Sequence, residues 1–67
     1  MRENKVFQSV AALPGHGLDD LVLLAYDDTP VKAHGIARRS LLAHLEKLLD
    51  EGRIATAGAG WQVAEAG

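Results

Sequence analysis

The chain has 67 residues, 48% of them hydrophobic, and its seven Lys and Arg against nine Asp and Glu give a net charge of −2. This size and composition indicate one small folded domain and exclude a disordered chain. The absence of cysteine excludes disulfides and cysteine-ligated zinc, and the acidic balance is unlike the basic surface of a dedicated nucleic-acid-binding domain.

Residues 2–13 are predicted to form the first helix. Apolar side chains recur at helical spacing within it, namely Val6, Phe7, Val10, Ala11 and Leu13. Pro14 and Gly15 are expected to end the helix, because proline cannot continue the backbone hydrogen bonds and glycine frees the turn.

Residues 18–26 are predicted to form the second helix, with Gly17 as its N-cap. Asp19 and Asp20 stand in the first turn, where carboxylates interact favourably with the positive end of the helix dipole. The run LVLLAY that follows is apolar on every side, which is typical of a helix buried on more than one side. Two interpretations remain, a small domain that exposes a leucine or two, or a second interface to another domain or another copy. The candidate residues of that interface are Leu23, Leu24 and Tyr26.

Residues 30–51 are predicted to form the third helix, around which the fold is built. Thr29 suits its N-cap and Pro30 its first position, while Gly35 favours a break or bend near its start, so that residues 31–35 form a short helix leading into the long one. Its apolar stripe consists of Ala37, Leu41, Leu45, Leu48 and Leu49, with Leu42 at the edge. Gly52 follows the stripe and is expected to end the helix in the left-handed conformation.

A β-hairpin is predicted after the third helix, with strands at residues 53–57 and 61–64 around a Gly-Ala-Gly turn. Trp61 and Val63 share one face of the return strand, and Trp61 is expected to cover the open end of the core. Together the elements predict a mainly α (α+β) fold, a three-helix winged helix-turn-helix domain with a two-stranded wing, as a single domain over residues 1–67.

No pattern in the chain indicates catalysis or metal binding. The three histidines His16, His34 and His44 lack the spacing of a helical zinc site. The adjacent carboxylates Asp19-Asp20 and Asp27-Asp28 splay apart, and they suit helix starts and turns better than acid–base chemistry. We therefore expect no catalytic residue, no metal ligand and no cofactor in this chain.

Nucleic-acid contact is the remaining candidate, on the outer face of the third helix. The residues that would make it are Arg38, Arg39, Ser40 and Lys47, with Arg53 at the root of the wing. Glu46 and Asp50 share this face, and the wing tip, residues 56–60, has no Lys or Arg. We expect a solvated face with local ion pairs; weak phosphate contact stays open, whereas sequence-specific readout is not expected.

The chain resembles a known family over about residues 2–64. The residues that carry the resemblance are 25–30 (AYDDTP), His34, Ala37, 40–48 (SLLAHLEKL), 51–54 (EGRI) and the opening Arg2-Glu3-x-Lys5-Val6. They resemble the winged-helix domain at the C-terminus of many metallo-β-lactamase-fold hydrolases. The middle of this pattern is fairly specific, whereas the EGRI exit is shared by many winged helices.

The resemblance implies a parent enzyme of hydroxyacylglutathione hydrolase-like or β-lactamase-like type, with two metal ions, usually zinc, held by a His-x-His-x-Asp-His motif. That motif is absent from this sequence, so the metal ions and the chemistry would belong to a catalytic domain outside it. In the family the winged helix packs beside the active-site cleft and helps shape substrate access, and some members act on RNA. The apolar second helix would then dock on the catalytic domain of the same parent chain.

We therefore interpret the chain as a non-catalytic accessory domain that packs on a catalytic domain and borders its substrate entrance. The alternatives are a nucleic-acid-binding module for RNA or DNA, and a dimerisation or protein-interaction domain that uses the second helix. The longest apolar run, residues 21–26, is too short to cross a membrane, and the first residues do not open a signal peptide. We expect a cytoplasmic location and no membrane partner.

Overall fold

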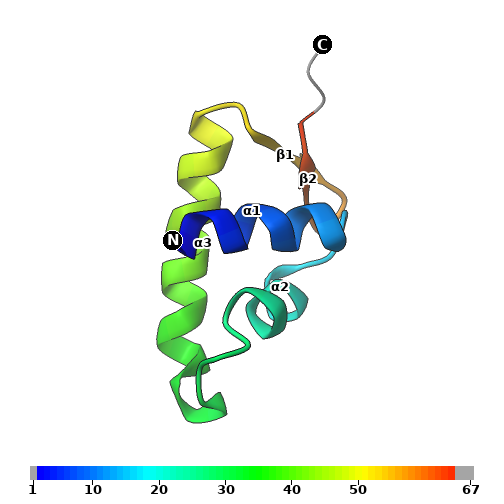
Figure 1. Cartoon of the computed structure of the whole chain (residues 1–67). Coiled ribbons are helices and arrows are strands. Elements are labelled where there is room, and N and C mark those ends of the chain that lie inside the picture. Colours follow the sequence, from blue (N-terminus) through cyan, green and yellow to red (C-terminus); the bar gives the residue numbers. More distant parts are fainter. Residues whose placement is uncertain (1, 65–67) are drawn as a thin grey trace.

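The computed structural model describes residues 2–64, and this part of the chain folds as a winged helix. Its elements are α1 (Arg2–Ala12), α2 (Leu18–Ala25), the short 3-10 helix η1 (Val31–Ala33), α3 (His34–Asp50), β1 (Ile54–Ala57) and β2 (Gly60–Val63). Figure 1 shows α1 running across α3 toward the hairpin, with α2 below α1. The three helices and the antiparallel hairpin confirm the predicted fold class.

The core lies between the three helices and is built mainly from aliphatic side chains. The predicted stripe of α3 faces it, since Ala37, Leu41, Leu45 and Leu48 are all buried. The largest fully buried side chains from the other helices are Val6, Val10, Leu21 and Val22. Leu42, at the edge of the stripe, is 39% exposed, so the boundary of the buried face falls where the helical period predicts it.

The C-terminal end of α3 is closed by a glycine in the left-handed conformation. Gly52 has φ 75°, and its N–H donates to the carbonyl of Leu49 at 3.0 Å. The N–H of Arg53 donates to the carbonyl of Leu48 at 2.9 Å. This pair of bonds is the Schellman arrangement, which satisfies carbonyls that the helix would otherwise leave free, and it confirms the predicted helix stop.

The start of α3 differs from the prediction. Thr29 does not cap a helix, because Pro30 itself takes the N-cap position of η1 with φ −57° and ψ 144°. The backbone N–H of Thr29 instead donates to the carbonyl of Tyr26 at 3.0 Å and closes the turn after α2. The α-helix begins only at His34, with Gly35 in its first turn. The short helix predicted to lead into it is present as η1, although it ends at Ala33 and not at Gly35.

The wing packs against the turn between α1 and α2. Its strands pair in the register Ile54↔Val63 and Thr56↔Trp61, with Ile54 buried and Trp61 half-buried against the core, as predicted for the tryptophan. The N–H of Gly15 donates to the carbonyl of Trp61 at 2.8 Å. A Cβ atom on Gly60 would lie 1.7 Å from the carbonyl oxygen of His16, so the two backbones touch here and only glycine fits.

None of the helices within residues 2–64 combines the length and the apolar character that a membrane crossing requires.

Candidate functional site

The basic residues predicted to face nucleic acid are mostly held in ion pairs with other elements. The Arg38 guanidinium lies 2.9 Å from a carboxylate oxygen of Asp19 on α2. Lys47 and Arg53 lie 3.0 and 3.6 Å from the carboxylate of Glu3 on α1. Ser40 is exposed, and Arg39 is exposed without an ion pair in the described part of the chain. Within residues 2–64, the expected local ion pairs with Glu46 and Asp50 do not form; the acids come instead from Asp19 and Glu3 in distant segments, and Glu51, 3.9 Å from Arg53, is the local partner.

Glu3 is the centre of the junction between α1, α3 and the wing. Its side chain is only 16% exposed, because it lies between Lys47 and Arg53. The hydrogen bond from Lys47, together with the positive charges of Lys47 and Arg53, lowers the pKa of Glu3. The same hydrogen bond raises the pKa of Lys47. The Arg53 guanidinium also lies over the ring of Phe7, 4.7 Å from its centroid. Lys47 and Arg53 are thus engaged within the domain, and a phosphate would have to compete with Glu3 for them.

Glu3→Gln is expected to destabilise the domain at neutral pH and to have little effect in acid. Since the folded state lowers the pKa of Glu3, the carboxylate contributes stability above the ordinary Glu pKa of about 4.3. That contribution is lost as the pH falls through the lower folded-state value. Urea denaturation of wild type and Glu3→Gln should give different midpoints at about pH 7 that converge below about pH 4.

The matched control is Glu46→Gln, which removes an exposed carboxylate that has no ion pair within the described residues. Its midpoint should follow that of the wild type across the pH range. A Glu3→Gln deficit that persists unchanged in acid would contradict the assigned role of Glu3.

The same N-terminal end of α1 is also held by an arginine, Arg2, which is the first residue of the helix. The Arg2 guanidinium lies 4.6 Å from the centroid of the Tyr26 ring, donates to the carbonyl of Ala25 at 2.7 Å and pairs with Asp28 at 3.1 Å. The hydrogen bond from Arg2 lowers the pKa of Asp28. Tyr26 is consequently only 7% exposed and belongs to the core. Its grouping with Leu23 and Leu24 on one exposed surface was wrong, because Arg2 and α1 cover its ring.

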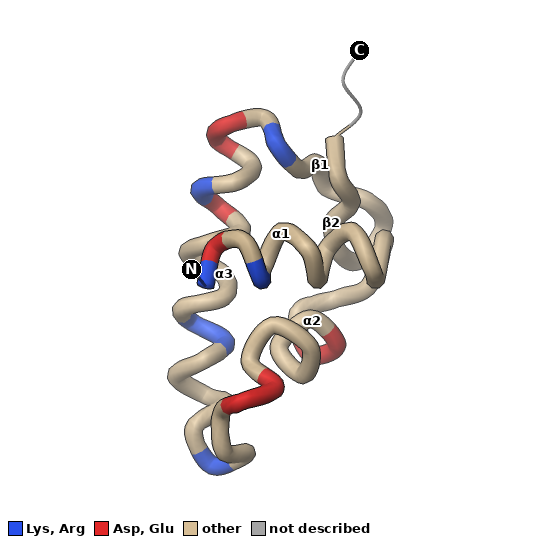
Figure 2. Tube along the Cα trace, viewed as in Figure 1, with Lys and Arg blue, Asp and Glu red and all other residues tan. Residues whose placement is uncertain are grey.

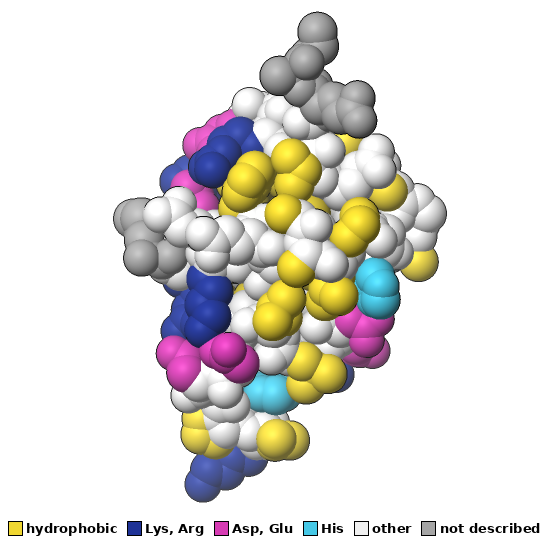
Figure 3. All heavy atoms as spheres, turned by 45° about the vertical axis from the view of Figure 1, so that its right-hand side comes forward, with side chains coloured by type: hydrophobic (Ala, Val, Ile, Leu, Met, Phe, Trp, Pro, Cys, Tyr) yellow, Lys and Arg dark blue, Asp and Glu magenta, His cyan; other side chains and the backbone are white. Residues whose placement is uncertain are grey.

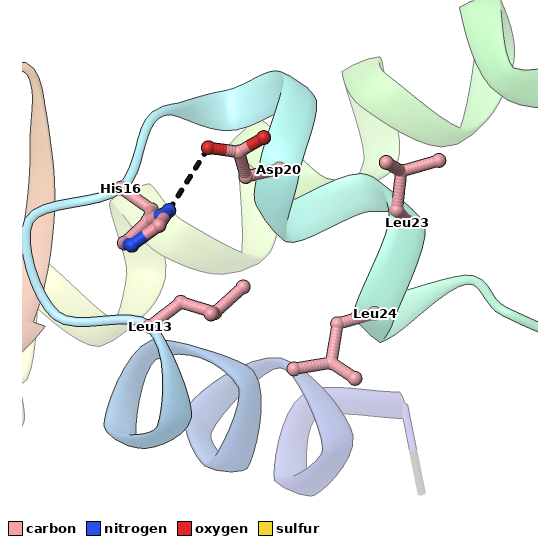
Figure 4. A pocket seen from close by; sticks show the side chains of 5 residues that line it. All are labelled: Leu13, His16, Asp20, Leu23 and Leu24. Atoms are coloured by element: carbon pink, nitrogen blue, oxygen red, sulfur yellow. Dashed lines mark hydrogen bonds and ion pairs between the residues drawn. The ribbon is translucent and has the colours of Figure 1, made fainter.

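Leu23 and Leu24 do lie on the surface, beside an apolar hollow. Their exposed fractions are 60% and 38%, and Figure 3 shows hydrophobic side chains gathered on this face. The hollow has a volume of about 380 Å³ and is lined by Leu13, His16, Asp20, Leu23 and Leu24. Figure 4 shows Leu13 and Leu24 extending into the space between α1 and α2, Leu23 farther along α2, and the His16–Asp20 contact on the side of the α1–α2 turn. A smaller hollow of about 260 Å³ adjoins it and shares Leu24.

Leu13, His16 and Asp20 were not predicted as part of this surface. The spacing of His16 and Asp20 is a signal that could have paired them, since residues four apart meet on a helix or at its start. Nδ1 of His16 lies 2.9 Å from Asp20 Oδ2. Leu13 is placed there by the turn at Pro14 and Gly15, which carries the chain from α1 to α2.

The described residues do not bring together a metal-binding cluster. No group of three or more His, Cys, Asp or Glu side chains within residues 2–64 is placed to hold a metal ion. His16 contacts Asp20, and Nε2 of His34 lies 3.1 Å from the carbonyl oxygen of Thr29. The chemistry that this surface offers is apolar contact with a small polar rim.

Comparison with known proteins gives the family. The sequence pattern described as "Beta-lactamase associated winged helix domain" matches residues 18–61, from the start of α2 to the return strand of the wing. Separate comparisons with curated proteins and with solved structures found no match. The matched region contains α2, η1, α3, β1 and the first two residues of β2, and α1 lies before it. The chain therefore belongs to the β-lactamase-associated winged helix domain family.

Proposed function

We propose that the chain is a non-catalytic accessory domain of a metallo-β-lactamase-fold hydrolase of hydroxyacylglutathione hydrolase-like type. In this proposal the domain packs on the catalytic domain of the same parent chain and borders its substrate entrance. Membership of the family supports the association with a β-lactamase fold. The apolar hollow on α2 supports the mode of attachment.

The observation that carries the proposal is the exposure of two neighbouring leucines on a short helix. Burying a leucine side chain fully is worth about 1.5–3 kcal/mol, so leaving Leu23 60% exposed forgoes part of that stabilisation. Leu13 extends the apolar surface, and the His16–Asp20 pair gives it a polar edge. An apolar centre with a polar rim is the usual composition of an interface between folded domains.

The proposal assigns the reaction to the parent's catalytic domain. The two zinc ions expected of such an enzyme would be held there by a His-x-His-x-Asp-His motif, which this sequence does not contain. The present domain would contribute a fixed wall beside the entrance and would exclude water from the junction. A parent gene that encodes no such motif would contradict the proposal.

Leu24→Ser in the complete parent protein is expected to loosen the domain from its partner. The serine hydroxyl would replace apolar surface at the junction, so amide hydrogen exchange in α2 should speed up at least about tenfold when the contact is lost. Bound zinc should stay unchanged, because the catalytic domain remains folded. Hydrogen exchange measured by mass spectrometry and metal analysis would record both effects.

Leu42→Ser is a closely matched control, since Leu42 and Leu24 are 39% and 38% exposed but lie on different helices. It should leave exchange in α2 unchanged. Exchange in α2 that is equally fast in the parent protein and in the isolated 67-residue chain would refute packing through this surface.

We do not extend the proposal to nucleic acid. Arg38, Lys47 and Arg53 are engaged by Asp19 and Glu3, so phosphate would have to compete with existing ion pairs. Phosphate neutralisation supplies most of the affinity of nucleic-acid-binding domains, and this face offers few free cations for it.

A further inference from the structure

The outer face of α3 carries a stripe of exposed residues whose role the proposed function does not explain. The stripe continues from η1 along the helix at a spacing of three or four residues. We call it the α3 stripe, and its members are Lys32, Ile36, Arg39, Ala43, Glu46 and Asp50. All six are exposed, and Ile36 is 73% exposed although it is a large aliphatic residue. The stripe lies opposite the side of α3 that faces the core.

The charges of the α3 stripe are separated along the helix. Lys32 and Arg39 lie toward its N-terminal end, and Glu46 and Asp50 lie toward its C-terminal end. Figure 2 shows basic positions in the N-terminal half of α3, and acidic positions interspersed with a basic one toward its C-terminal end. Within residues 2–64, none of these four side chains takes part in an ion pair, although five other Lys and Arg side chains do. The free charges of the α3 stripe are therefore available to a partner.

This order of charges is the opposite of the one that stabilises an isolated helix. The helix dipole favours acidic side chains at the N-terminal end and basic ones at the C-terminal end. The first turn of α3 contains no acidic residue, and its last turn contains Asp50 together with the basic Lys47, which is outside the stripe and pairs with Glu3. The helix dipole therefore does not account for the order of charges within the stripe, whereas an antiparallel helix beside it would.

We propose that the α3 stripe binds a second copy of this chain, with the two α3 helices antiparallel across a two-fold axis. In that arrangement Arg39 of one copy faces Glu46 of the other, and the symmetry repeats the contact. Ala43 lies near the midpoint between these residues, where its small side chain lets the helices approach closely. The two helix dipoles also oppose each other, which is favourable. A surface that complements itself is the requirement for a closed two-fold dimer.

The length of α3 limits this contact to a modest interface. Its 17 residues span about 25 Å, so a single pair of helices would give a weak, salt-sensitive dimer. The apolar hollow at Leu23 and Leu24 lies on α2 and is not used. The dimer can therefore form whether or not the hollow docks on a catalytic domain. An RNA backbone on the same face would be repelled by Glu46 and Asp50.

Sedimentation of the 67-residue chain tests the proposal. We expect the weight-average mass to rise from monomer toward dimer as the concentration increases from about 10 μM to about 1 mM at about 20 mM salt. The rise should shrink at about 500 mM salt, where the charges are screened. A chain that stays monomeric over the whole range would overturn the proposal.

Charge reversal tests the geometry. Arg39→Glu and Glu46→Arg should each weaken the dimer at least tenfold, although they shift the net charge in opposite directions. An equimolar mixture of the two variants should dimerise, because one chain then carries two acids and the other two arginines. The double variant Arg39→Glu/Glu46→Arg should also dimerise. Each contact between positions 39 and 46 again joins an acid to an arginine, with the two charges exchanged. Circular dichroism would verify that each variant is folded.

The remaining outcomes decide against the proposal. A dimer that survives both single reversals, or one that is lost in Leu24→Ser, would place the contact elsewhere. Failure of the double variant to regain the dimer would exclude the antiparallel register. Because Leu24 belongs to the hollow and Arg39 to the α3 stripe, these results also separate a failure of this inference from a failure of the proposed function.

Discussion

Gly60→Ala is expected to lower the free energy of unfolding by about 3 kcal/mol, the upper part of the range for forcing an extra methyl group into a packed site. The added Cβ would lie 1.7 Å from the carbonyl oxygen of His16 and 2.4 Å from its carbonyl carbon. Both atoms are backbone, so no side chain can swing aside. Either the return strand of the wing or the turn between α1 and α2 must move. Urea denaturation followed by circular dichroism measures the loss.

Gly35→Ala is the control for this variant. Gly35 has open space where its Cβ would be, and it lies in the first turn of α3. Alanine there should be neutral or stabilising by up to about 1 kcal/mol, because glycine loses more chain entropy in a helix. If Gly60→Ala unfolded at the wild-type urea concentration, the wing would not rest on the turn in solution.

Leu45→Ala is expected to remove most of the free energy of unfolding, so that a large fraction of the molecules is unfolded at room temperature. Leu45 is fully buried on the core side of α3, and truncating such a leucine costs about 2–5 kcal/mol through lost burial and the cavity left behind. A domain of this size has a total stability of only about 3–5 kcal/mol. The far-ultraviolet helical signal at 25 °C and the thermal midpoint would show the effect.

Leu42→Ala removes the same atoms from the same helix but from a side chain that is 39% exposed. Its cost should stay below about 1 kcal/mol, as is usual for surface positions. Equal destabilisation by Leu42→Ala and Leu45→Ala would mean that the two faces of α3 are not distinguished as the structure describes.

The fold could be predicted because its main signals are local in the sequence. The 3.6-residue period of Leu41, Leu45 and Leu48 identifies the core face of α3 without knowledge of its partners. Gly52 marks the end of that helix because the required φ of 75° suits glycine. The start of α3 was harder to predict, since Thr29 and Pro30 are each compatible with a turn as well as with the first positions of a helix.

The site could be predicted only in part because its contacts are distant in the sequence. Helical spacing placed Arg38 and Lys47 on the outside of α3, but nothing local indicates that Asp19 and Glu3 would reach them. Tyr26 was placed on the surface for the same reason. Arg2, which covers its ring, is the first residue of α1, whereas Tyr26 follows the end of α2. The exposure of Leu23 and Leu24 followed from the excess of apolar residues in α2.

The contact between the wing and the α1–α2 turn has a consequence for the order of folding. The hydrogen bond from Gly15 to Trp61 joins residues that are far apart in the sequence, and such contacts carry a high loop-closure cost. A two-stranded hairpin is marginally stable alone, so the wing should become ordered only after the helices have assembled. A substitution that weakens contacts formed after the transition state mainly raises the unfolding rate. We therefore expect Gly60→Ala to unfold faster, with little change in its folding rate. Trp61, the single tryptophan, is thereby a fluorescent reporter of the last step in folding.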